Sequence, residues 1–212
     1  FGVNLAATAQ SATGLPLPTE LGGVNVRITD RMGTERNAPL FYVSPNQINY
    51  QIPSGTALGL ARVTISSGAT GVVEIREISP GLFSADSTGT GYAAAVIQRV
   101  KSNGEQSYEP IVKFDVALNR FVALPIDVSD PTEKVFLAVF GTGIRGRSSL
   151  SNVNAKVGVT DVEVVYAGEQ GDFAGVDQIN LRLPSDLKGT GETIVNIVVD
   201  GVPANSVNIA IR

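Results

Sequence analysis

The 212-residue chain contains no cysteine, no histidine and no tryptophan. Without cysteine there is no disulfide framework, no thiolate metal ligand and no thiol nucleophile. Without histidine the chain lacks the usual general base near neutral pH and the most common metal ligand. These absences exclude Ser-His and Cys-His nucleophilic sites and remove the central residue of most enzyme classes. We therefore expect a protein that is not an enzyme and that carries no cofactor or metal.

Clustered positive charge and long apolar runs are also missing. Sixteen basic and twenty acidic residues give a net charge of -4, and no Lys/Arg cluster is present to follow a phosphate backbone. No stretch approaches the roughly 20 apolar residues that a membrane helix needs. We expect neither a nucleic-acid partner nor membrane insertion. Phe1 opens on folded-looking sequence without a charged leader region, so we expect a removed targeting segment or an excerpt of a longer protein.

The residues that are present favour β-structure. Hydrophobic residues make up 43% of the chain and charged residues 17%, which is too apolar for a disordered protein. Val, Ile and Thr recur in short alternating runs separated by Gly, Pro, Asn and Asp, and no window keeps the spacing of an amphipathic helix. The pattern predicts an all-β sandwich or barrel. The expected strands are residues 24–29, 47–52, 61–66, 72–78, 111–118, 121–128, 135–140, 162–166, 178–183, 194–199 and 207–211.

Turn residues between these runs predict antiparallel hairpins. Asn103-Gly104 and Asp200-Gly201 suit the two positive φ angles of a type I′ turn, and Asn119-Arg120 lies between two alternating strands.

An internal repeat is the most informative feature of the sequence. Residues 47–53 (QINYQIP) reappear as residues 178–184 (QINLRLP), and residues 1–5 (FGVNL) match residues 140–144 (FGTGI). Within each heptad the apolar residues alternate with polar ones, which places them on one face of a strand. We expect this face to belong to a hydrophobic core, and the prolines to end the strands.

The repeat predicts two diverged immunoglobulin-like sandwich units of similar size. We place the first at residues 1–83 and the second at residues 135–212. Residues 84–134 have no duplicate and are expected to form a β-hairpin insertion between the units.

The polar face of the repeated heptad supplies candidate site residues, because amide side chains both donate and accept hydrogen bonds. A recognition strip is one interpretation. A structural motif whose amides bond adjacent loop backbone is the favoured one. The residues concerned are Gln47, Asn49, Gln178 and Asn180.

Three other patterns have a chemical interpretation that we consider weaker. Residues 141–146 (GTGIRG) have the glycine spacing of a dinucleotide site, but no helix is predicted after them to face a pyrophosphate. An acidic loop at Asp127, Asp130 and Glu133 offers oxygen ligands for Ca²⁺, yet lacks EF-hand spacing, and a solvated turn is favoured. Scattered carboxylates would permit a glycosidase pair, although the absence of tryptophan leaves little surface for sugar stacking. These carboxylates include Glu74, Asp115 and Glu163.

Several segments, in order along nearly the whole chain, resemble the Solibacter uncharacterised C-terminal domain family. They are residues 1–6, 17–24, 38–49, 80–83, 141–143 and 175–180. Each half also resembles the IPT/TIG immunoglobulin-like unit, with its opening strand-to-glycine turn at Phe1-Gly2 and at Phe140-Gly141. The resemblance implies an exported bacterial protein, often a terminal module of a larger chain, and brings no established activity or catalytic residues. Family members usually have a strand before this turn, whereas the present sequence starts at the turn.

Together with the repeat, this resemblance implies an extracellular or cell-surface module of a bacterium, structural or adhesive in role. We expect a homo-oligomer or polymer that self-associates by β-strand complementation into a surface assembly or filament, with Phe1 and Gly2 as the candidate assembly site. Other surface proteins or glycans are further candidate partners. The alternatives are a spacer or carbohydrate-binding appendage of a larger secreted protein, and an enzyme with a carboxylate-based site.

Overall fold

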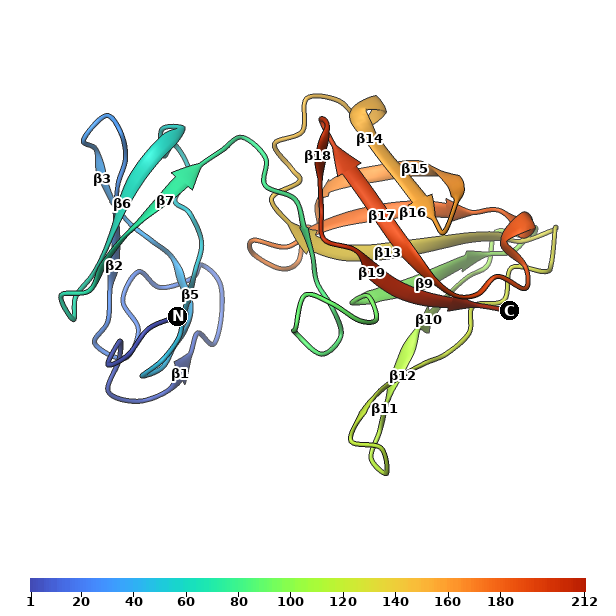
Figure 1. The fold of residues 1–212 in the computed structure, drawn as a ribbon, viewed down its shortest axis with the longest axis horizontal. Coiled ribbons are helices and arrows are strands. Elements are labelled where there is room, and N and C mark those ends of the chain that lie inside the picture. The colour runs from blue at the N-terminus through green and yellow to red at the C-terminus, as the bar shows by residue number, and fades with distance from the viewer. The chain divides into compact units, whose positions relative to one another are not determined.

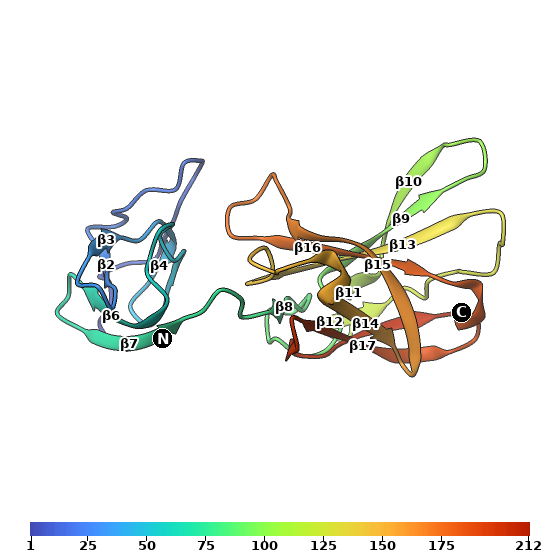
Figure 2. The ribbon, with the colours of Figure 1, turned by 90° about the horizontal axis from the view of Figure 1, so that it is seen from above.

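Antiparallel strands form almost all of the regular structure in the computed structural model, which describes residues 1–212 and is all-β as predicted (Figures 1 and 2). The only helical elements are two single turns of 3-10 helix, η1 (Leu150–Asn152) and η2 (Ser185–Leu187). The chain divides into two compact units, Phe1–Glu77 and Ile78–Arg212.

The first unit contains two sheets. One has the strand order β3-β2-β6-β7 and the other the order β1-β4-β5. Alternate residues of the strands point inward, and Val26 and Ile28 of β2 share a buried cluster with Leu40 and Val43 of β4. The strands are β1 (Gln10–Ser11), β2 (Val26–Thr29), β3 (Glu35–Asn37), β4 (Leu40–Val43), β5 (Ile48–Tyr50), β6 (Gly59–Ile65) and β7 (Thr70–Ile75).

The second unit is built from a continuous succession of strands in the order β10-β9-β13-β16-β15-β14-β17-β18, with β8 on β13 and β19 on β17. A separate hairpin is formed by β11 and β12. The strands are β8 (Gly81–Leu82), β9 (Ala95–Val100), β10 (Gln106–Pro110), β11 (Val112–Asp115), β12 (Arg120–Ala123), β13 (Lys134–Thr142), β14 (Val153–Val157), β15 (Thr160–Glu169), β16 (Asp177–Leu183), β17 (Gly191–Val199), β18 (Val202–Pro203) and β19 (Val207–Ile211).

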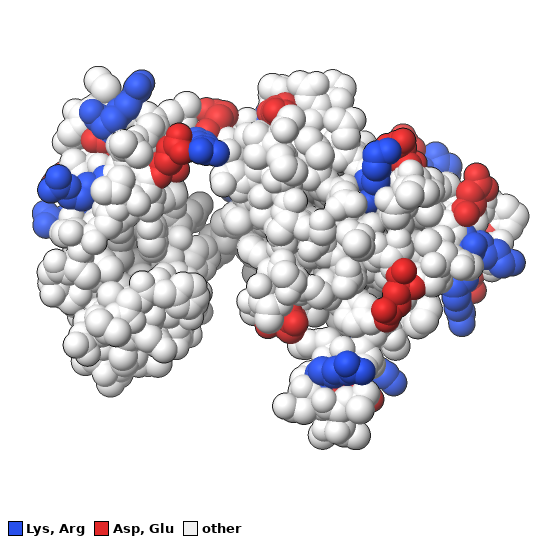
Figure 3. Space-filling model, in the orientation of Figure 1, with Lys and Arg blue, Asp and Glu red and all other residues white.

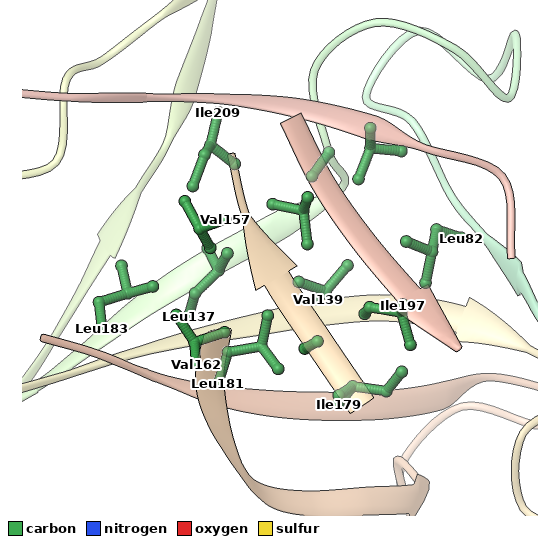
Figure 4. Packing of buried hydrophobic residues seen from close by; sticks show 14 of the residues in the cluster. Leu82, Leu137, Val139, Val157, Val162, Ile179, Leu181, Leu183, Ile197 and Ile209 are labelled. Carbon is green, nitrogen blue, oxygen red and sulfur yellow. The ribbon is translucent and has the colours of Figure 1, made fainter. Parts of the chain in front are cut away.

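Strand β15 joins the two layers of the second unit. Its first residues pair with β14, and from Glu163 onward it pairs with β16, with a bulge between Val164 and Tyr166. A core fills the space between the layers, to which β13 and β16 contribute Leu137 and Ile179, while β14 and β17 contribute Val157 and Ile197 (Figure 4).

The pairs β4·β5 and β15·β16 share one register. Leu40 is opposite Tyr50 and Val43 is opposite Ile48, with a bulge between Leu40 and Tyr42. In the second unit Val164 is opposite Leu181 and Ala167 is opposite Ile179, with the bulge in the corresponding place. The order β3-β2-β6-β7 likewise matches the order β15-β14-β17-β19.

The division between units differs from the predicted ranges 1–83, 84–134 and 135–212. It falls between Glu77 and Ile78, because β8 pairs with the end of β13 and so joins the second unit. Residues 84–134 supply β9 and β10, and β9 pairs with β13 along its length. Two strands of the predicted insertion, β9 and β10, are therefore part of the second unit's sheet, whereas β11 and β12 form the separate hairpin.

The two predicted type I′ turns differ in outcome. Asp200 and Gly201 have φ angles of 45° and 80° between β17 and β18, as a type I′ turn requires. At the other turn only Gly104 has a positive φ, 84°, and the amide of Lys101 donates to the carbonyl of Glu105. The type I′ prediction was wrong there, because the loop has three residues and places only the glycine in the left-handed region.

Candidate functional site

The four amide residues form two matching pairs. Nε2 of Gln47 donates to Oδ1 of Asn49 at 2.7 Å, and Nε2 of Gln178 donates to Oδ1 of Asn180 at the same distance. We expected these amides to bond adjacent loop backbone, whereas in the structure each glutamine bonds to the asparagine two residues further along the chain. Each amide is held by its neighbour, which fits the structural role better than a recognition strip.

The loops around Phe1-Gly2 and Phe140-Gly141 also correspond. The amide of Gly2 donates to the carbonyl of Asn46 at 3.0 Å, and Gly141 is opposite Asp177, the residue before the second QIN segment. Two residues after each glycine the backbone has a positive φ, 55° at Asn4 and 72° at Gly143. The next residues, Leu5 and Ile144, are both buried.

The two QIN strands differ in their neighbours. Strand β16 lies between β15 and β13, and β13 pairs with it from Val135, opposite Leu183, to Gly141, opposite Asp177. Strand β5 pairs with β4 alone. The amide of Gln51 and the carbonyl of Gln47 bond toward the β4 side. Because alternate residues of a strand direct their backbone groups to opposite sides, those of Ile48 and Tyr50 face an edge with no partner strand.

Burial also differs between the two QIN strands. Ile179, Leu181 and Leu183 are buried on the core face of β16. Their positional counterparts in the first unit, Ile48 and Tyr50, are only half-buried against the core, and Ile52 is 39% exposed. Partial burial raises the pKa of the Tyr50 hydroxyl. The open edge of β5, defined here as Ile48, Tyr50 and Ile52 with their outward backbone groups, therefore exposes hydrogen-bonding groups and apolar surface together.

The segments that form β5 and its sheet contain no charged side chains. None of residues 1–19 or 37–61 is charged, and these segments hold β1, β4 and β5. Figure 3 shows the part of the first unit that carries β1 and β5 without blue or red residues on the visible face. Proteins usually protect exposed strand edges with charges, and interface cores are depleted of them. This edge has the composition of an interface.

Other edge strands of the two units do carry charges. Strand β3 has Glu35 and Arg36. Strand β7 has Glu74, which pairs with Arg76 at 2.5 Å just beyond its end. Strand β10 has Glu109, which pairs with Arg99 at 2.9 Å, and ends at a proline. Strand β1 is uncharged but only two residues long. Among these five strands, β5 is the one that lacks charge protection and still offers outward backbone groups beside a core.

The glycine pattern at residues 141–146 has a packing explanation. A side chain at Gly141 would meet the carbonyl oxygen of Gly81, and one at Gly143 would meet that of Ser79. The pattern is followed by η1 and then β14, so no long helix begins behind the glycines as a dinucleotide site requires.

The acidic loop at residues 127–133 uses its carboxylates locally. Oδ1 of Asp127 accepts from the amide and hydroxyl of Ser129, and these bonds lower the pKa of Asp127 to about 2. Oδ1 of Asp130 accepts in the same way from Thr132, and Glu133 pairs with Arg99 at 2.9 Å. No group of three or more acidic side chains is placed to hold a metal ion. The loop has the bonding of a solvated turn.

The three scattered carboxylates lie on separate strands with partners of their own. Glu74 of β7 pairs with Arg76 just beyond the strand, Asp115 accepts from the amide of Leu118 at 3.0 Å, and Glu163 pairs with Arg182 at 3.4 Å. Glu163 lines a hollow of about 380 Å³ whose walls carry both acidic and basic side chains.

Two buried acids hold loops that the sequence argument did not single out. Asp30 accepts from the amides of Met32, Thr34 and Ala57 and from Arg36 at 2.7 Å. Asp177 accepts hydrogen bonds from the amides of Ile144 and Arg145 and from the side chain of Arg145, at 2.7 to 3.1 Å. In the sequence each of these aspartates lies within three residues of a glycine in a turn. This arrangement is the sequence signal that would have identified them as loop-holding residues.

Comparison with protein-family models, with curated proteins and with solved structures gave no match. The resemblance to the Solibacter family and to IPT/TIG units therefore stays a prediction. No helix in the structure is long and apolar enough to span a membrane.

Proposed function

We propose that the chain is a structural module that self-associates by β-strand addition at the open edge of β5, and that it works at the bacterial cell surface or outside the cell. The observation that carries the proposal is the contrast between β16, whose second edge is filled by β13, and β5, whose corresponding edge is empty.

We further propose that the two units are diverged repeats. The shared register and bulge of β4·β5 and β15·β16 support this, as do the matching positive φ angles at Asn4 and Gly143. Under this proposal, β16 with β13 is a template for what the edge of β5 accepts: an antiparallel strand with apolar residues at alternate positions.

Strand addition is favoured physically because it would pair the free backbone groups of this edge and cover its apolar surface at the same time. Added backbone groups would bond to those of Ile48 and Tyr50, and added side chains would cover the apolar surface that extends to Ile52. A spacer or a carbohydrate-binding appendage is the alternative function. The lack of charged residues in the segments that form this edge favours protein contact over that alternative, since sugar sites combine aromatic rings with fixed polar groups.

Sedimentation velocity over a range of concentrations tests the proposal. We expect the chain to associate as its concentration rises, and Ile52→Lys to weaken association by roughly tenfold or more, since it places a charge in an apolar contact. Val72→Lys is the matched control, because Val72 is an exposed apolar residue on the β7 edge of the same unit. We expect it to associate like the unmodified chain.

Two results would overturn the proposal. One is a chain that stays monomeric at every concentration. The other is equal association of the Ile52→Lys and unmodified chains, because association would then use another surface. Circular dichroism of the variants at low concentration establishes that each is folded.

A further inference from the structure

We propose that the strand added to β5 comes from the β11–β12 hairpin of a second copy of the chain. The inference rests on the proposed function and identifies its partner. It follows from the hairpin's isolation, its apolar face, its outward backbone groups and the charges on the competing strands.

The hairpin is not part of any larger sheet. Strands β11 and β12 pair only with each other, from Val112 opposite Ala123 to Asp115 opposite Arg120. Figure 1 shows the hairpin extending away from the other strands of the second unit. Two-stranded ribbons are marginally stable in water, so a hairpin of this kind gains stability from a third strand.

One face of the hairpin and its tip are apolar and exposed. Phe114 is 50% exposed and lies edge-to-face with Phe121, with ring centroids 5.4 Å apart. At the tip, Val116 is 83% exposed and Leu118 is 56% exposed. Within β11, Val112 and Phe114 alternate as Leu137 and Val139 do in β13, which directs them into the core beside β16. Val112 packs partly against the second unit's core, and Val116 and Leu118 lie in the turn that follows β11.

The outer edge of β11 has backbone groups available for pairing. The amide of Leu124 donates to the carbonyl of Ile111, so Ile111 and every second residue after it face β12. The backbone groups of Val112 and Phe114 consequently face outward. The residues with outward backbone groups are also those with apolar side chains, and the same combination occurs at the open edge of β5.

Charge separates the hairpin from other candidate donors. The edge strand β10 carries Glu109 and ends at Pro110, and β7 carries Glu74. In β11 the charges, Lys113 and Asp115, lie on the face opposite Phe114. Adding β11 to β5 would place these charges beside the polar amide face, where solvent reaches them, and would leave the apolar contact neutral.

Donor and acceptor are different surfaces, so the contact is heterologous. Each copy would offer one hairpin and one open edge, and repetition of such a contact gives an open filament unless its rotation closes a ring.

Mixing two defective variants tests the assignment. Ile52→Lys blocks the acceptor, and Val116→Lys or Phe114→Lys blocks the donor. For each variant alone we expect the association constant to fall by roughly tenfold or more. In an equimolar mixture, one acceptor-blocked copy and one donor-blocked copy can still form a single contact, so we expect a dimer and nothing larger. Tyr108→Lys, on the exposed edge of β10, is the control and should assemble like the unmodified chain.

The outcomes separate this inference from the proposed function. If the unmodified chain assembles and Ile52→Lys does not, but both hairpin variants assemble normally, strand addition at β5 stands and the donor is another segment. If the unmodified chain never assembles, the proposed function itself fails.

Disulfide trapping provides a second readout, since the chain has no cysteine of its own. We expect copies with Gln51→Cys to cross-link to copies with Lys113→Cys or Asp115→Cys, because these side chains lie on the polar faces that would adjoin. Copies with Tyr108→Cys should not cross-link to Gln51→Cys. A chain carrying both Gln51→Cys and Lys113→Cys that closes on itself at high dilution would overturn the assignment to a second copy.

Discussion

The carbonyl oxygen of Gly81 occupies the space that a side chain on Gly141 would require. The contact is backbone to backbone, so no flexible side chain can yield. We expect Gly141→Ala to destabilise the second unit by about 1 to 3 kcal/mol, the usual cost of forcing extra atoms into a packed site. Urea unfolding followed by circular dichroism measures the change.

Gly81, whose carbonyl oxygen lies against Gly141, is the control for this prediction. A side chain at Gly81 meets only Oδ1 of Asn205 at 3.9 Å, an ordinary contact distance. We expect Gly81→Ala to change the urea midpoint far less than Gly141→Ala. An equally small effect of both substitutions would show that β8 and β13 move apart easily.

Ile179 is fully buried in the core of the second unit. We expect Ile179→Ala to cost about 2 to 5 kcal/mol, from lost apolar burial and the cavity left behind. Thr142→Ala should cost far less, because Thr142 is exposed and its hydroxyl makes one bond, to the carbonyl of Gly175 at 3.0 Å. An unchanged urea midpoint for Ile179→Ala would contradict the packing shown in Figure 4.

Local alternation predicted the all-β class and the inward face of the QIN strands, since side chains of a strand alternate between its faces. Strand β8 escaped prediction because it has two residues, whose backbone is held by Asn205, 123 positions away in sequence. The empty edge of β5 depends on which strands pair, and pairing is not local. The uncharged run 37–61 was readable in the sequence and would have directed attention to this edge.

Asp30 makes the stability of the first unit depend on pH. Its bonds from the amide of Ala57, the amides of Thr34 and Met32 and the side chain of Arg36 lower its pKa from 3.8 to about 2. As the pH falls from about 4 to 2, the unfolded chain takes up a proton on this group while the folded chain resists it. The stabilisation from Asp30 is therefore complete above pH 4 and is lost as the pH approaches 2.

The variant Asp30→Asn isolates this effect. We expect its urea midpoint to lie below that of the unmodified chain by a constant amount above pH 4, and the difference to shrink toward pH 2. A difference that stays constant over the whole range would mean that ionisation of Asp30 does not contribute.

Amide hydrogen exchange examines the open edge of β5 residue by residue. In dilute solution we expect the amides of Ile48 and Tyr50 to exchange quickly, because they face no partner strand, while the amide of Asn49 is protected by its pairing with β4. The corresponding amides of Ile179 and Leu181 should be protected throughout, because β13 pairs with them.

At higher concentration, strand addition predicts that Ile48 and Tyr50 become protected while Asn49 changes little. This alternation distinguishes a paired strand from general burial, which would slow exchange at all three residues together. In Ile52→Lys the two edge amides should stay fast at every concentration. If Ile48 and Tyr50 exchange quickly in an associated sample of the unmodified chain, association occurs through a surface other than the edge of β5.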